Sequence, residues 1–250
     1  MRFKDHFSAG ASDYARFRPR YPEALFDWLA AQAPSRALAW DVATGSGQAA
    51  TALASRFARV VATDASAAQL ASAETRPNIN YRCEPAEHAS LPDGDVDLVT
   101  VAQALHWFDH AAFFREVARV LRPGGVLAVW CYEVFEATPE VDAVISDLYH
   151  RVVGPYWPPE RRWIETGYAD LALPFPRVEA PPFAMSLEWD LDALVGYLGT
   201  WSAVQRYRQD RHEDPLVSAR ARLARVWGDP AKKRRVAWPL TLHVGRATGA

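Results

Sequence analysis

An acidic residue that begins a run of small residues, together with a second acidic residue after the next apolar segment, could hold an adenosine-containing ligand. The run Asp41-Val42-Ala43-Thr44-Gly45-Ser46-Gly47 follows a short apolar segment, and its small side chains let the backbone approach a bound molecule. Asp64 lies nineteen residues after Gly45, at the end of the next apolar segment. A carboxylate in that place can accept hydrogen bonds from both ribose hydroxyls of an adenosine.

Three interpretations of this turn are open on the residues alone. A nicotinamide dinucleotide is bound by G-x-G-x-x-G, and here Ala50 stands where the third glycine belongs. Asp41 would also repel a diphosphate, whereas it suits a ligand with an ammonium group. S-adenosyl-L-methionine (SAM) contains adenosine, no phosphate and a cationic amino acid tail, so the residues favour it. A structural turn followed by a chance acid is the third interpretation.

Apolar periodicities predict the elements that must position this turn. Strands are expected at residues 37–42, 60–63, 79–83, 96–101 and 126–130. Helices are expected at residues 22–33, 46–58, from Ser66 onward, and at 110–121. Because short strands alternate with helices, the sequence indicates βαβ units and a mainly parallel, doubly wound sheet. Ligands bind such sheets beyond the carboxyl ends of the strands, which is where Asp41 and Asp64 are expected.

The second half of the chain has a different pattern. Residues 131–175 are rich in proline and aromatic residues, and we interpret them as an insertion or cap. The elements expected after it are a strand within 177–189, helices at 191–209 and 216–227, and a closing strand at 236–245. The expected fold is an α/β, Rossmann-like, mostly parallel sheet of seven strands with a final antiparallel strand and a helical, aromatic cap. The expected divisions are an arm and helix at 1–35, a core at 36–131, the cap at 132–175, and strands and helices at 176–250 that complete the sheet and the substrate pocket.

The composition excludes several classes of protein. The chain has 250 residues, of which 50% are hydrophobic, and this excludes intrinsic disorder. Its net charge of −2 argues against nucleic acid or an anionic membrane as the main partner. Cys83 and Cys131 cannot form a disulfide framework and lack zinc-site spacing, so we expect no metal. Because we find no secretory signal and no uncharged apolar stretch of about 18 residues, the expected compartment is the cytoplasm.

The order and spacing of these residues resemble the class I SAM-dependent methyltransferases with a methyltransferase type 11 domain. The motifs that carry the resemblance are Asp41 to Gly47 (similar to D/E-x-G-x-G-x-G, with Ala43 at the first glycine), Asp64, Pro85-Ala86-Glu87 with Leu91-Pro92, Asp97-Leu98-Val99 and Leu121-Arg122-Pro123-Gly124-Gly125. Together they cover residues 36–131. Three further segments, at 14–22, 102–109 and 197–205, resemble a subgroup that includes the trans-aconitate and cantharidin type small-molecule methyltransferases.

The resemblance implies a SAM-dependent methyltransferase that releases S-adenosyl-L-homocysteine and methylates a small molecule, with a carboxylate or hydroxyl oxygen favoured. The implied cofactor site contains Tyr14, Arg18, Asp41, Ala43, Thr44, Gly45, Gly47, Asp64, Ala65, Ala86, Glu87, Gln103 and Ala104. By analogy, the arm with Arg16, Arg18 and Arg20 closes over the cofactor, and the Arg18 guanidinium suits the methionine carboxylate. A solvated arm is the alternative. The alternative functions are a SAM-binding protein without transferase activity and a nicotinamide-dependent oxidoreductase, and we expect a monomer or homodimer.

The acceptor is expected beside the strand that ends near residue 101. His106 follows that strand, and an imidazole with a pKa of about 6.5 could deprotonate or orient an acceptor. A structural histidine that caps the following helix is the alternative. The implied substrate-binding residues are Tyr21, His106, Trp107, Tyr132 and Trp201, and the aromatic ones could instead pack in a core or pocket wall. A carboxylate acceptor needs no base, whereas a hydroxyl acceptor does.

Overall fold

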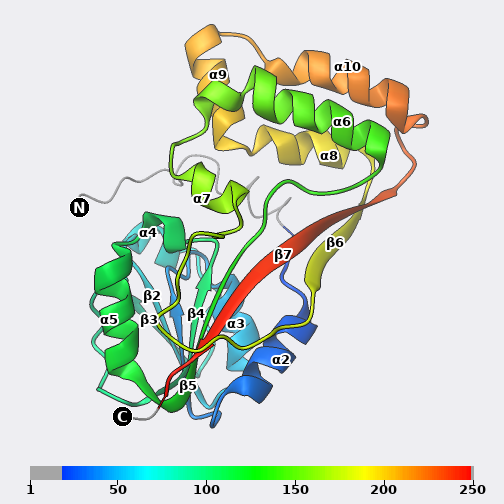
Figure 1. Ribbon diagram of the computed structural model, residues 1–250. Helices are drawn as coiled ribbons and strands as arrows, with labels where there is room; N and C mark the ends of the chain where they lie inside the picture. The colour runs from blue at the N-terminus through cyan, green and yellow to red at the C-terminus, as the bar shows by residue number, and fades with distance from the viewer. Residues whose placement is uncertain (1–18, 249–250) are drawn as a thin grey trace.

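A mixed sheet of seven strands runs through the protein, whose computed structural model describes residues 19–248 (Figure 1). The strands lie in the order β3-β2-β1-β4-β5-β7-β6. Their bounds are β1 Leu38–Val42, β2 Arg59–Asp64, β3 Ile79–Cys83, β4 Val96–Ala102, β5 Leu121–Cys131, β6 Phe183–Trp189 and β7 Arg234–Arg246. The first five strands are parallel, whereas β7 is antiparallel to both β5 and β6. The expected Rossmann-like, mostly parallel sheet of seven strands is confirmed.

Helices cover both faces of the sheet (Figure 1). The helices that accompany the first five strands are α2 Glu23–Gln32, α3 Gln48–Ala54, α4 Ala67–Leu70, the 3-10 helix η1 Leu105–Trp107 and α5 His110–Val120. Small strand residues, among them Ala39 and Ala128, share an apolar cluster with α2 and α3. Larger residues such as Trp40 and Val99 share another cluster with α5. Both faces of the central strands are therefore apolar, as is typical of parallel sheets.

The remaining helices form a layer above the ends of β6 and β7, which we call the helical layer (Figure 1). It consists of α6 Pro139–Asp147, the π-helix η2 Leu148–Val152, the 3-10 helix η3 Gly154–Tyr156, α8 Leu191–Gly199, α9 Ser202–Arg211 and α10 Pro215–Trp227. A short helix, α7 Arg161–Glu165, lies between this layer and the sheet. One apolar cluster, which includes Leu194, Leu223 and Trp238, joins the layer to β7. None of the helices within residues 19–248 is long and apolar enough to cross a membrane.

The single helix expected at 191–209 is two helices, α8 and α9. The chain is extended at Trp201, with φ −66° and ψ 128°. The Trp201 ring is 5.6 Å from both the Tyr149 ring and the Trp157 ring, measured between centroids. Burial of this indole among other aromatic rings stabilises a break that the helical periodicity of the sequence does not show.

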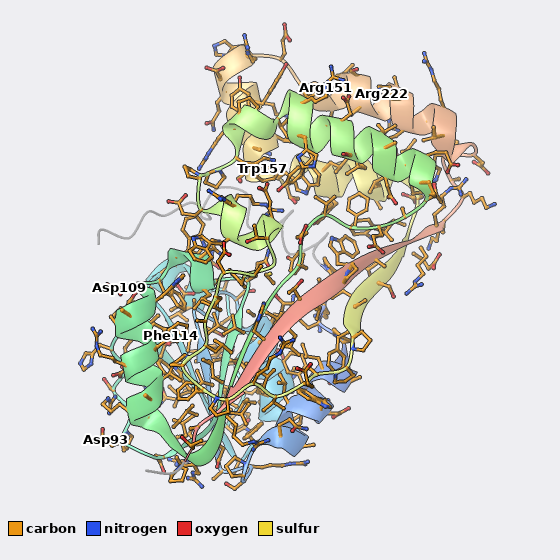
Figure 2. All side chains as sticks on the ribbon, in the orientation of Figure 1. Asp93, Asp109, Phe114, Arg151, Trp157 and Arg222 are labelled. Carbon is orange, nitrogen blue, oxygen red and sulfur yellow. The ribbon has the colours of Figure 1, made fainter. Side chains whose placement is uncertain are left out.

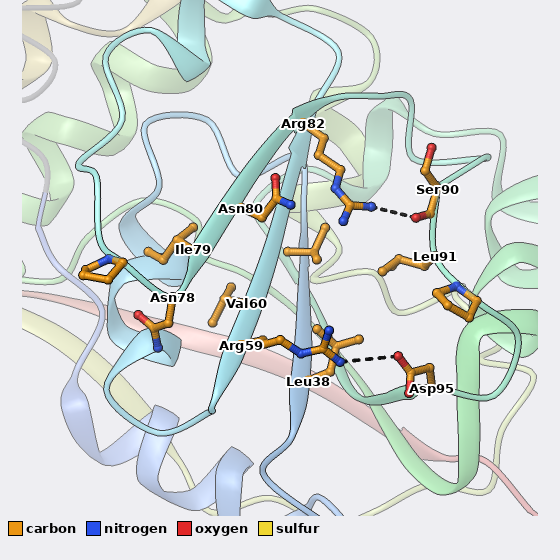
Figure 3. Close-up of a pocket in the computed structure, with 13 residues that line it drawn as sticks. Leu38, Arg59, Val60, Asn78, Ile79, Asn80, Arg82, Ser90, Leu91 and Asp95 are labelled. Atoms are coloured by element: carbon orange, nitrogen blue, oxygen red, sulfur yellow. Dashed lines mark hydrogen bonds and ion pairs between the residues drawn. The ribbon is translucent and has the colours of Figure 1, made fainter.

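A groove of about 460 Å³ lies on the sheet beside β1, β2 and β3 (Figure 3). Leu38 and Arg59, the first residues of β1 and β2, line it. An Arg59–Asp95 ion pair of 3.7 Å crosses one side, and Arg82 donates to the Ser90 carbonyl at 2.7 Å on another (Figure 3). The predicted site residues do not line this groove, because they follow the opposite, carboxyl ends of the strands.

Candidate functional site

The turn between β1 and α3 contains three residues in the left-handed backbone region. Their φ angles are +51° at Ala43, +56° at Gly45 and +83° at Gly47. Glycine suits position 47, because a φ of +83° strains a residue with a Cβ atom and because that atom would displace the Tyr81 hydroxyl. The turn therefore presents its backbone at the carboxyl edge of the sheet, and α3 begins only after Gly47.

The strain at Ala43 is testable, because this residue stands where the resembled motif has glycine. The left-handed conformation costs a residue with a Cβ atom about 1–2 kcal/mol, and the unfolded-state entropy of glycine offsets part of that cost. We expect Ala43→Gly to raise Tm by about 2–4 °C in a calorimetric scan. Ala39→Gly, at a fully buried position in β1, is the control and should lower Tm. A lower Tm for Ala43→Gly would contradict strain in the turn.

Asp41 lies beneath the turn with its carboxylate buried. Thr44 Oγ1 donates to one carboxylate oxygen at 2.5 Å, and Thr100 Oγ1 donates to the other at 2.7 Å. Burial raises the pKa of Asp41 from 3.8 to about 6, and the two hydroxyl hydrogen bonds oppose that rise. The side chain fixes the turn through Thr44 and places a negative charge beneath it. That charge favours a cationic ligand over a diphosphate.

Asp64, at the end of β2, connects to the turns on both sides. Its Oδ2 accepts the Gly45 N–H at 2.9 Å, and its Oδ1 accepts the Ser66 N–H at 2.8 Å. The residue is only 8% exposed, and burial raises the pKa of its carboxyl. Each carboxylate oxygen can accept a second hydrogen bond, and Ala65 beside it is exposed. These remaining acceptor positions fit the two ribose hydroxyls of SAM.

The loop after β3 carries the predicted residues Ala86 and Glu87. Glu84 N–H donates to the Asp64 carbonyl at 3.1 Å, which brings the start of this loop beside Asp64. Ala86 is buried, and Glu87 Oε1 accepts the Asp109 N–H at 3.0 Å. The loop is therefore held between the end of β2 and the start of α5, next to the acceptors that fit a ribose.

Gln103 joins the ends of β4 and β5. Its side-chain nitrogen donates to the Tyr132 carbonyl at 3.0 Å, and its side-chain oxygen accepts the Tyr132 N–H at 2.8 Å. Its own N–H donates to the Trp130 carbonyl at 2.8 Å, and its φ is +56°. The amide of Gln103 thus holds two strand ends together, and the buried Ala104 follows it at the start of η1.

His106 is a neutral imidazole on η1. Its Nδ1 is 2.9 Å from the Tyr168 hydroxyl, and its ring centroid is 4.6 Å from that of Trp107. Burial lowers the pKa of His106 to about 3. The ring can therefore hydrogen-bond an acceptor at neutral pH, although it is a weak base. His106 does not cap the following helix, α5. The capping residue is Asp109, whose Oδ1 accepts the Ala112 N–H at 3.0 Å.

Tyr21 lies near the end of β5. Its ring centroid is 5.4 Å from that of Trp130 and 6.4 Å from that of Tyr132. Its N–H donates to Gln48 Oε1 at 3.2 Å, and Gln48 Nε2 donates to the Pro19 carbonyl at 3.3 Å. The first residue of α3 thus holds this segment beside the turn. Gln48 was not among the predicted residues, although it directly follows the turn motif.

The other predicted aromatic residues differ in their surroundings. Trp107 is half-buried beside His106. Tyr132 and Trp201 are 5% and 8% exposed, and both belong to the apolar cluster of the helical layer. Trp201 therefore packs in a core, one of the two arrangements expected for it. Tyr14 and Arg18 lie outside the described residues.

Two residues that the sequence did not indicate, Arg161 and Tyr168, join the site from the proline-rich segment. The buried Tyr168 contacts His106, and burial raises the pKa of its hydroxyl. The helix α7, which begins with Arg161, packs against η1. Their position depends on this packing, for which the segment carries no sequence motif. Across residues 19–248, no group of three or more His, Cys, Asp or Glu side chains is arranged to hold a metal ion.

Comparisons with known proteins agree with this geometry. The methyltransferase domain family matches residues 40–129. A Dictyostelium discoideum protein named as a methyltransferase is 33% identical over 230 residues, which span 90% of this chain and 88% of that protein. An uncharacterized methyltransferase of Mycobacterium bovis is 42% identical over 126 residues, about half of each chain. A solved structure from Anaeromyxobacter dehalogenans, described as a type II methyltransferase, is 46% identical, with a TM-score of 0.89 over 94% of this chain and 100% of that one.

Proposed function

Because this chain belongs to the class I SAM-dependent methyltransferases, with SAM as its cofactor, we propose that it methylates a carboxylate or hydroxyl oxygen of a small molecule. When bound, SAM supplies an electrophilic methyl group on a sulfonium sulfur. Asp64 would hold the ribose, the turn from Ala43 to Gly47 would lie against the cofactor, and Gln103 fixes the strand ends beside it. Alignment of the acceptor oxygen can contribute roughly 7–11 kcal/mol to lowering the barrier.

The observation that carries this proposal is the neutral His106 held by Tyr168 at the end of β4. An imidazole with a pKa of about 3 is a poor proton acceptor, but it can orient an oxygen by hydrogen bonding. A carboxylate acceptor is already ionised at neutral pH and needs no base. Between the two acceptor types, the site therefore favours a carboxylate.

Two further observations support a small acceptor. The helical layer stands above the sheet on the side where α7 meets η1, so the acceptor side is bordered by apolar and aromatic residues (Figure 2). The net charge of −2 supports a small molecule over a polyanionic nucleic acid. The segments at 102–109 and 197–205 support assignment to the trans-aconitate and cantharidin type subgroup.

The proposal is tested by transfer of labelled methyl groups from SAM to a panel of carboxylic acids and alcohols. We expect transfer to at least one carboxylic acid, with a rate that does not change between about pH 6 and 9. His106→Ala should lower kcat by about 100-fold at every pH in this range, because the variant loses orientation and not a base. Transfer to alcohols alone would contradict the carboxylate assignment, and transfer to no member would contradict the proposed function.

Two variants serve as controls. Tyr168→Phe keeps the His106 ring but removes its hydrogen-bond partner, and it should lower kcat by a smaller factor. His212→Asn changes an exposed histidine that lines neither the groove nor the cavity, at a left-handed position that asparagine tolerates, and it should leave kcat unchanged. Recovery of the His106→Ala activity at high pH would show that His106 acts as a base.

A further inference from the structure

The guanidinium of Arg161 is fixed in place, yet its two terminal nitrogens are not engaged by the protein. Its Nε donates to the Tyr149 hydroxyl at 2.8 Å. The guanidinium carbon lies 4.7 Å from the centroid of the Trp157 ring and 5.5 Å from that of Tyr149. Within residues 19–248, no hydrogen bond or ion pair reaches its Nη1 or Nη2. Since a half-buried guanidinium offers five donors, the geometry leaves a preformed place for an anion.

The guanidinium is close enough to the ends of β4 and β5 for its charge to act on groups there. The helix α7 packs against η1, which carries His106. Burial is the main cause of the lowered pKa of His106, and the charge of Arg161 adds to it. The same charge opposes the rise that burial causes in the pKa of Glu133, which follows the end of β5. The ends of these two strands are also joined by Gln103. Arg161 therefore lies on the acceptor side of the site described above.

A cavity of about 320 Å³ lies next to this guanidinium. Arg161, Tyr149, Trp157 and Glu165 are among the residues that line it. Tyr149 belongs to the π-helix η2, an irregularity that occurs frequently at functional sites. Figure 2 shows Trp157 just above α7, between the helical layer and the sheet. The cavity is thus placed where a small molecule could contact Arg161.

We propose that Arg161 is a specificity-determining residue that binds a carboxylate of the acceptor other than the oxygen that receives the methyl group. This inference rests on the proposed function and narrows its substrate to dicarboxylic or hydroxycarboxylic acids. The planar guanidinium matches a carboxylate in a two-point arrangement, and stacking on Trp157 fixes its plane beforehand. A carboxylate bound in this way is a weaker nucleophile, so it acts as an anchor. The nearby acids Glu133 and Glu165 repel any anion there, and they repel a doubly charged phosphate more strongly than a singly charged carboxylate.

The test is calorimetric binding to the protein saturated with S-adenosyl-L-homocysteine. The probes are linear dicarboxylates and hydroxy acids of about four to six carbons. Each acid is compared with the derivative in which one carboxylate is replaced by a neutral carboxamide. We expect at least one acid to bind the wild type tenfold or more tightly than its amide. Arg161→Gln should abolish that preference, and Arg161→Lys should retain only part of it because it loses the two-point geometry.

The matched control is Arg225→Gln, which removes an exposed arginine of α10 that does not line this cavity and should keep the wild-type preference. Affinity for S-adenosyl-L-homocysteine should be equal in all four proteins, which shows that the variants are folded and that Arg161 does not bind the cofactor. A wild type without preference for any acid, or an Arg161→Gln variant that keeps the preference, overturns the inference. Preferential binding without methyl transfer to any acid would refute the proposed function while leaving the assignment of Arg161 intact.

Discussion

Asp64→Ala is expected to weaken the binding of S-adenosyl-L-homocysteine by at least about 100-fold. Hydrogen bonds to a charged group contribute about 1.5–3 kcal/mol each, and the loss of two such bonds to the ribose corresponds to about 100-fold or more in Kd. The variant also loses the acceptors for the Gly45 and Ser66 N–H groups, which hold the two turns in place. Isothermal titration calorimetry measures the effect directly.

Two variants distinguish loss of the ribose contacts from general damage. Asp64→Asn keeps the shape of the side chain and one good acceptor oxygen, so its affinity should lie between those of the wild type and Asp64→Ala. Asp95→Ala removes an acid beside the groove near the amino-terminal ends of the strands and should bind as the wild type does. Wild-type affinity in Asp64→Ala would show that the ribose is held elsewhere.

Asp41→Asn is expected to stabilise the ligand-free protein while it weakens cofactor binding. The pKa of Asp41 is 3.8 when unperturbed and about 6 in the folded protein, because burial favours the protonated form. The folded state therefore binds more protons than the unfolded state between about pH 4 and 6, and the contribution of Asp41 to the free energy of unfolding falls as pH rises through this range. Above pH 6, the ionisation of Asp41 has lowered the free energy of unfolding by about 3 kcal/mol relative to its value below pH 4. An asparagine at this position avoids that loss.

Chemical denaturation at pH 4 and pH 8 tests this linkage. The difference in unfolding free energy between Asp41→Asn and the wild type should increase from pH 4 to pH 8. Asparagine also removes the negative charge beneath the turn, so affinity for the cationic SAM should fall about tenfold. A stability difference that does not change with pH would contradict a buried, ionised Asp41. Glu213→Gln, at an exposed acid between α9 and α10, controls for the general effect of removing one negative charge.

The sequence was sufficient to predict the first half of the fold because its elements are short, regular and separated by clear turns. The strand expected at 79–83 has those bounds in the structure, and the strand expected at 96–101 extends by one residue. The helical layer was harder to predict. Residues 131–175 contain three short helical elements besides α6, and α8 and α9 separate at Trp201 because its ring packs against other aromatic residues far along the chain.

The residues of the candidate site also fall into two groups, those that the sequence alone could locate and those that it could not. Asp41 and Asp64 could be located from sequence because each follows a strand of the parallel sheet. Arg161 and Tyr168 could not, because they reach His106 only through the packing of α7 on η1. The neutral state of His106 is also a product of burial, and an isolated histidine with a pKa of about 6.5 does not indicate it.

A crystal structure of the protein with S-adenosyl-L-homocysteine bound would show whether the edge between β1 and β2 holds the nucleoside and whether the ends of β4 and β5 receive the acceptor. We expect both ribose hydroxyl oxygens within about 3.2 Å of the Asp64 carboxylate, and the sulfur directed toward the side that carries His106 and Arg161. A ribose bound to other side chains, or a sulfur that faces away from His106, would contradict the account.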